Sequence, residues 1–161
     1  MNRKTLTIAK LAIIVFATLI CGLLVYYISS FAVGSQLATQ SNNMMLSRWQ
    51  DRFLRLTMAA GGLSGVCSLI WFILTRWVFK INTPFDTGKR TIWALLAAVS
   101  LFGSILIPRF YSVTLGIKVN VVVIAVFVFF FTVLGYWLVS IFTTSRAFKY
   151  TPVGARLFSR K

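Results

Sequence analysis

The sequence predicts an all-α integral membrane protein, with one membrane domain over residues 1–161 folded as a bundle of four transmembrane helices. Hydrophobic residues make up 58% of its 161 residues, and 17 Lys and Arg stand against two acidic residues. A soluble domain carries charges of both signs at about a quarter of its positions, so this composition excludes one. The charges also cluster between four long runs without Asp, Glu, Lys or Arg, each near the roughly 20 residues that cross about 30 Å of hydrocarbon as a helix.

The first span is predicted over about residues 11–34, after the charged start MNRKTLTIAK. A charged start followed by an apolar stretch is also the layout of a secretory signal sequence. The apolar stretch here is longer than the roughly 7 to 15 residues of a cleaved signal, so we expect it to remain as a transmembrane helix.

An outer amphipathic helical segment is predicted at 44–56, as a short lead-in to the second span. Its apolar side chains share one helical face at the spacing i, i+3, i+7 and i+10: Leu46, Trp49, Phe53 and Leu56. A neighbouring basic stripe contains Arg48, Arg52 and Arg55, and Asp51 has the spacing to pair with Arg55 four residues on.

Such a segment has two interpretations. An apolar face beside a basic face, joined to a transmembrane helix, is typical of a helix that rests in the membrane interface. Alternatively, the segment docks on a partner outside the cytoplasm, with aromatic and arginine anchors. The interfacial or docking residues are then Arg48, Trp49, Arg52, Phe53 and Arg55.

The second span is predicted at about 57–76 and contains the small-residue stretch AAGGLSG. Gly61 and Gly65 lie four residues apart, with Ser64 beside them. Small residues at this spacing let two helix backbones approach closely, which drives helix association in lipid. These three residues are therefore candidates for helix packing within the chain or for a partner interface.

The third and fourth spans are predicted at about 91–108 and 119–144. The third is the shortest of the four charge-free runs. The fourth contains VNVVVIAVFVFFF, which is too long for a strand, and its phenylalanines point to several sides of a helix. Trp77 and Trp93, near the ends of the second and third spans, are expected to be aromatic anchors at the membrane surface.

Both termini are predicted to be cytoplasmic. Twelve of the 17 basic residues fall in the amino-terminal segment, the loop between spans two and three, and the basic tail at 146–161, whereas the other two loops hold five. The net charge of +15 is explained by this topology and by contact with anionic lipid headgroups, so no nucleic-acid partner is expected.

No catalytic, cofactor or metal site is predicted, and we expect no enzyme. Membrane enzymes and ion-coupled transporters place ionisable groups within or facing their spans, and the uncharged runs offer none. The chain has no histidine, and its two cysteines fall inside predicted spans.

The expected function is therefore protein–protein contact in a membrane, with other integral membrane proteins or further copies of this chain. We expect a small inner-membrane subunit of a bacterial envelope assembly, of the secretion or conjugation type. In layout the chain also resembles immunity proteins against pore-forming bacteriocins, which implies protection against a toxin or an incoming donor. A third alternative is a small oligomeric transporter.

Overall fold

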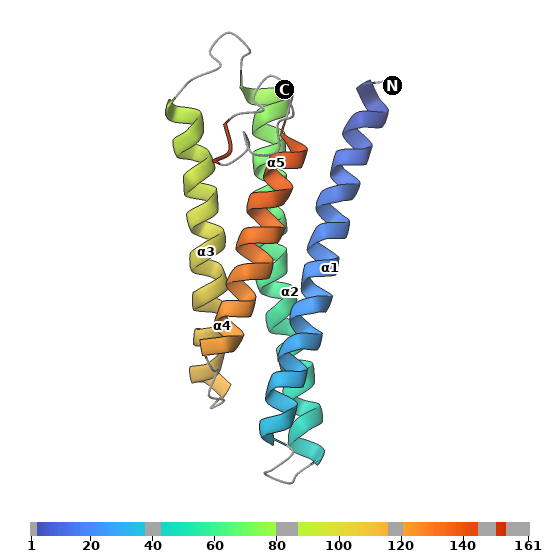
Figure 1. The fold of residues 1–161 in the computed structure, drawn as a ribbon, viewed down its shortest axis with the longest axis vertical. Helices are drawn as coiled ribbons and strands as arrows, with labels where there is room; N and C mark the ends of the chain where they lie inside the picture. The colour runs from blue at the N-terminus through green and yellow to red at the C-terminus, as the bar shows by residue number, and fades with distance from the viewer. Residues whose placement is uncertain (1–2, 38–42, 80–86, 116–120, 145–150, 154–161) are drawn as a thin grey trace.

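The computed structural model describes residues 3–37, 43–79, 87–115, 121–144 and 151–153. The chain forms four long helical rods (Figure 1), and the fourth is built of three consecutive segments. The elements are α1 (Arg3–Leu37), α2 (Asn43–Ile73), the π-helix η2 (Leu74–Val78), α3 (Thr87–Leu115), α4 (Val121–Phe127), the π-helix η3 (Val128–Leu138) and α5 (Val139–Thr143).

Each rod contains a helix long and apolar enough to cross a membrane, which confirms the prediction of four spans. The candidate spans are Thr5–Phe31, Asp51–Val78, Thr87–Phe110 and Val121–Thr143. Figure 1 places the start of α1 and the end of α5 at the same end of the bundle, as an even number of spans requires. The described residues contain no strand.

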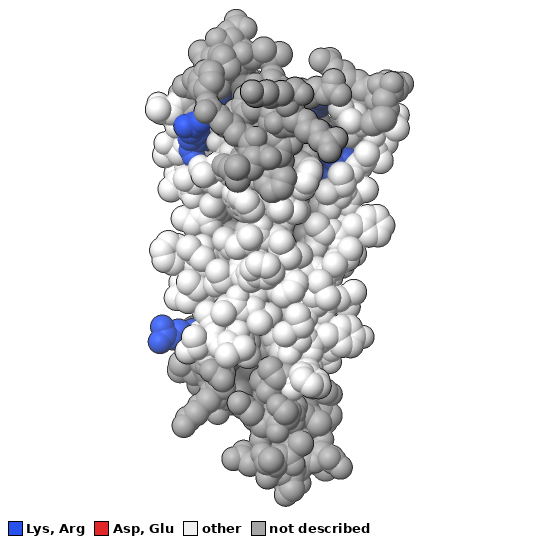
Figure 2. Space-filling view, in the orientation of Figure 1, with Lys and Arg blue, Asp and Glu red and all other residues white. Residues whose placement is uncertain are grey.

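The surface has the charge distribution of a membrane protein. On the face shown in Figure 2, blue basic side chains lie towards the two ends, and a broad uncharged band separates them. Large apolar side chains of the spans are well exposed, among them Phe16, Phe102 and Phe129. An apolar surface of this extent is costly in water and favourable in lipid, so the chain is a membrane protein.

Two diagonally opposite helices of the bundle, α2 and η3, are in direct contact. Helix α2 contacts α1 on one side and α3 on the other, and it also packs directly on η3. One core cluster is aromatic and aliphatic, around Phe53, Phe127 and Phe131, and a second is centred on Trp71 and Tyr136. Because α2 and the fourth span each contribute to both clusters, these two helices form the centre of the fold.

Two features of the spans differ from the sequence prediction. The third helix extends past the predicted end of its span at Pro108 and continues to Leu115. Proline removes one backbone hydrogen bond, and transmembrane helices tolerate this where neighbouring helices surround the site; Pro108 is fully buried. The fourth span contains eleven π-helical residues in η3, which the apolar pattern did not indicate.

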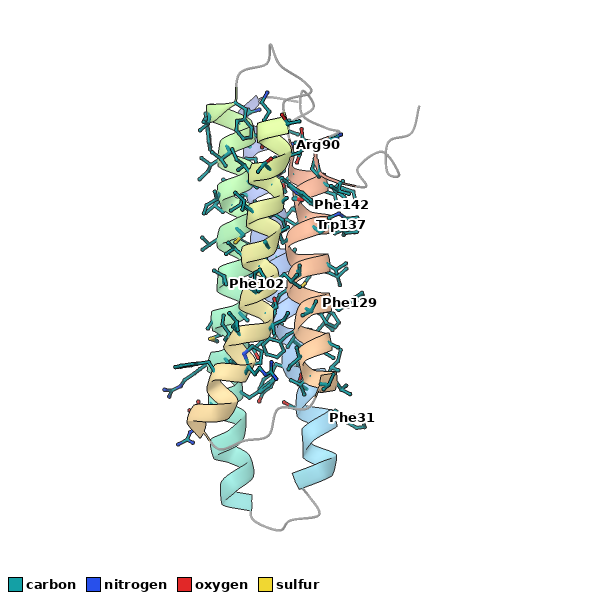
Figure 3. All side chains as sticks on the ribbon, turned by 90° about the vertical axis from the view of Figure 1, so that its left-hand side faces the viewer. Phe31, Arg90, Phe102, Phe129, Trp137 and Phe142 are labelled. Carbon is teal, nitrogen blue, oxygen red and sulfur yellow. The ribbon has the colours of Figure 1, made fainter. Side chains whose placement is uncertain are left out.

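The α1–α2 pair is longer than the other two rods. In Figures 1 and 3 both helices project past the ends of α3 and α4, at the end opposite the start of α1. Helix α2 runs unbroken from Asn43 to Ile73, so residues 44–56 are helical and continuous with the second span.

Candidate functional site

The small residues of α2 form a close seam with η3. A Cβ atom on Gly61 would lie 3.1 Å from Cε1 of Phe131, closer than ordinary van der Waals contact. Ser64 Oγ donates a hydrogen bond of 2.5 Å to the carbonyl of Phe131, and Ser68 Oγ donates one of 2.9 Å to the carbonyl of Gly135. Two hydroxyls one turn apart on α2 therefore bind two carbonyls one turn apart on η3.

The η3 side of the seam also needs a residue without a side chain. A Cβ atom on Gly135 would lie 2.9 Å from Ser64 Oγ and 3.2 Å from the backbone oxygen of Phe130. Helix α3 adds hydroxyls from its side, since Ser104 Oγ lies 3.2 Å from Thr132 Oγ1. π-Helices are rare in proteins, and those that occur are often found at functional sites. This hydroxyl-bonded stretch is therefore the most unusual part of the fold.

Gly65 faces a different helix from Gly61. A Cβ atom on Gly65 would lie 3.0 Å from Thr18 Oγ1 and 3.2 Å from Thr18 Cγ2, both on α1. The predicted set of Gly61, Ser64 and Gly65 thus divides between the fourth span and the first, and all three make contacts inside the chain. Gly62 differs, because a Cβ atom there would meet nothing within 4 Å.

A second polar cluster lies near the end of the bundle where α5 finishes. Trp71 Nε1 donates to Thr144 Oγ1 at 2.8 Å, and Trp93 Nε1 donates to Ser140 Oγ at 2.9 Å. The hydroxyl of Tyr136 donates to the carbonyl of Trp93 at 2.8 Å. Each of these aromatic polar atoms is satisfied within the bundle, which makes the cluster a stabilising network.

Trp93 corrects one sequence prediction. Its side chain is 6% exposed and packs on Tyr136, so it is an interior residue and not an aromatic anchor at the membrane surface. Trp77 is 64% exposed, as the same prediction required. Trp77 lies one residue before the end of η2, whereas Trp93 lies six residues inside α3.

Lys10 connects the first and fourth spans. Its ammonium Nζ donates to the carbonyl oxygens of Thr143 and Thr144, at 2.9 and 2.8 Å. The last carbonyls of a helix have no intrahelical partner and carry partial negative charge, so a cation there satisfies both needs. Sequence reasoning treated Lys10 as a topology signal and did not find this contact.

The part of the predicted amphipathic segment whose side chains are described, residues 51–56, has a buried face and an exposed face. Phe53 is buried and packs edge-to-face on Phe127, with ring centroids 5.7 Å apart, while Arg52 and Arg55 are exposed. The predicted pair between Asp51 and Arg55 is confirmed, with Asp51 Oδ2 and Arg55 Nη2 3.1 Å apart. The pair is solvent-accessible and contributes little to stability.

The structure limits which outer residues are candidates for docking. The backbone of Arg48 and Trp49 is helical as part of α2, and their side chains lie outside the described residues. Phe53 is covered by the fourth span. Arg52 and Arg55 are the predicted docking residues whose side chains are described and exposed.

No protein family, curated protein or solved structure matches this chain.

Proposed function

We propose that this chain is a non-catalytic subunit of a bacterial inner-membrane assembly, of the secretion or conjugation type, which acts by binding other proteins. The proposal follows from how the interior is used. The hydroxyls of Ser64 and Ser68 and the indole N–H groups of Trp71 and Trp93 are committed to hydrogen bonds between helices. Polar groups that are paired in this way suit a scaffold.

The observation that carries the proposal is the projecting outer end of α1 and α2 (Figures 1 and 3). From Arg76 of η2, about 20 residues cross the hydrocarbon and reach Leu56. Helix α2 continues from there to Asn43, thirteen residues and roughly 20 Å of helix at about 1.5 Å per residue, of which Asp51 to Arg55 belong to the candidate span. Its exposed side chains include Arg52 and Arg55, so an acidic surface on a partner outside the cytoplasm would complement it.

The proposal is tested by purifying the protein from its native membranes in mild detergent and identifying what accompanies it. Replacing Arg52 and Arg55 together with glutamine should remove the outer partner and leave the bundle folded. Arg90→Gln, at the opposite end of the bundle (Figure 3), is the charge control and should keep the partner. Loss of folding in the double variant, or equal loss of the partner in both variants, contradicts the docking role.

The runner-up is an immunity or exclusion protein. Its support is the arrangement itself, a small basic bundle of four spans with its outer end projecting. The two functions differ in a protection assay. Cells that express the chain should show no raised tolerance to pore-forming bacteriocins if it is an assembly subunit, and resistance to one toxin would favour immunity.

A further inference from the structure

An apolar groove of about 280 Å³ lies between α1 and α2 on the outside of the bundle. Its walls come from both helices: Leu11, Val15 and Leu19 on α1, and Gly62, Val66 and Leu69 on α2. Val15 is 57% exposed and Val66 is 52% exposed, so the groove opens towards the membrane.

The hollow exists because α2 lacks side chains at two positions along this seam. Gly65 is covered by Thr18, whose Oγ1 donates to its own helix at the carbonyl of Ile14, 2.8 Å away. Gly62 is exposed, and a Cβ atom there would meet nothing within 4 Å. The groove is therefore lined by apolar side chains, and the space above Gly62 is open.

Arg76 lies at one end of the same seam. Its Nη2 atom donates to Thr7 Oγ1 at 3.2 Å. Thr7 and Thr18 are eleven residues apart on α1, and Gly65 and Arg76 are eleven residues apart on the facing helix. The contacts Thr7–Arg76 and Thr18–Gly65 therefore belong to one antiparallel register, and Arg76 lies on this seam past Leu69, the lining residue nearest to it in the sequence.

The distance from Gly65 to Arg76 corresponds to one leaflet of a membrane. Eleven residues at about 1.5 Å each give ~16 Å, and half of a hydrocarbon core of about 30 Å is ~15 Å. The lining residues farthest from Arg76 are Leu19 and Gly62, about halfway along their spans. A partner helix that crossed the whole bilayer would need a seam about twice as long.

We propose that this groove binds one anionic phospholipid, with an acyl chain between α1 and α2 and the phosphate on Arg76. A guanidinium presents five N–H donors in a planar fork that matches phosphate, and the bond to Thr7 uses one of them and orients the rest. The basic charge at this end of the bundle favours an anionic headgroup over a zwitterionic one. This site is separate from the outer surface of the proposed function.

The headgroup part is tested by native mass spectrometry of the purified protein with phosphatidylglycerol or phosphatidylcholine of the same acyl chains. The wild type should retain one phosphatidylglycerol with a preference of about tenfold. Arg76→Gln should abolish the preference. Arg90→Gln also removes one positive charge from this end of the bundle (Figure 3), and this variant should keep the preference for phosphatidylglycerol. Equal losses in the two variants, or no preference in the wild type, overturn the site.

The groove part is tested by filling the hollow. Gly62→Trp should lower retention of phosphatidylglycerol about tenfold, and Val15→Trp fills the groove from the α1 side if the first variant folds poorly. Ala94→Trp, at an exposed position on α3, is the control and should retain the lipid. Unchanged retention in both groove variants overturns the proposal. The proposal is also overturned if the groove variants retain the lipid but lose a dimer or a bound protein, because a protein helix then occupies the groove.

Discussion

Replacing Gly61 or Gly65 with leucine should destabilise the isolated protein. The Cβ atom alone would lie 3.1 Å from Phe131 Cε1 in the first case and 3.0 Å from Thr18 Oγ1 in the second, and leucine adds three more carbon atoms. Overpacking of this kind costs about 1 to 3 kcal/mol. For a chain of this size each kcal/mol corresponds to a fall of about 2–4 °C in the thermal midpoint, so we expect a loss of roughly 2–12 °C.

Gly62 is the matched control, one residue from Gly61 in the same helix. A Cβ atom there meets nothing within 4 Å, and leucine is a better helix former than glycine by up to about 1 kcal/mol. Gly62→Leu should therefore leave the midpoint unchanged or raise it slightly. The assay is thermal unfolding in mild detergent, followed by circular dichroism and by the monodisperse fraction on gel filtration.

Two results would refute this reasoning. If Gly61→Leu and Gly65→Leu unfold at the wild-type temperature, the two glycines are not in tight contacts within the chain. If the thermal midpoint of Gly62→Leu falls as far as that of the other two variants, the loss of stability reflects the position in the span and not the contacts of each glycine.

Three further predictions concern the hydrogen bonds and the topology. Replacing Ser64 and Ser68 together with alanine should lower stability by about 1 to 2 kcal/mol, since interhelical bonds in membranes contribute about 0.6 kcal/mol each on average and up to 1.7; an unchanged midpoint would show that η3 does not need these donors. Lys10→Met should cost about 1.5 to 3 kcal/mol, because two carbonyl oxygens at the end of α5 lose a charged donor, and Lys10→Arg should recover part of the loss in the same thermal assay. Reporter fusions at Lys161 and within residues 35–43 should report opposite compartments, and the same compartment for both would remove one span.

The spans were predictable because the physics behind them is local. A charge-free run of about 20 residues has few alternatives to a transmembrane helix, and four such runs gave four helices. The Asp51–Arg55 pair was predictable for the same reason, since residues four apart are neighbours on any helix.

The contacts between helices were not predictable in this way. Periodicity assigned Phe53 to the apolar face of its helix, but it does not say whether lipid or the fourth span covers that face. In a membrane both surroundings are apolar, so composition cannot separate them. Trp93 was misplaced for this reason.

The π-helix in the fourth span depends on tertiary contacts as well. Its carbonyls at Phe131 and Gly135 accept bonds from Ser64 and Ser68, which lie 67 residues away in each case. Gly135 gave a weak signal, since a glycine inside an apolar helix often has a packing reason. No pattern within the span itself indicated which helix would approach it.

The central claim is that the outer end of α2 contacts another protein. A photo-crosslinking amino acid at Arg52, introduced into the protein in its native membrane, tests it most directly, with the same group at the exposed, lipid-facing Phe102 of α3 as control. We predict one discrete protein adduct from position 52, reduced by Arg55→Gln, and no discrete adduct from position 102. Only lipid adducts at position 52, or the same protein adducts from both positions, would contradict the account.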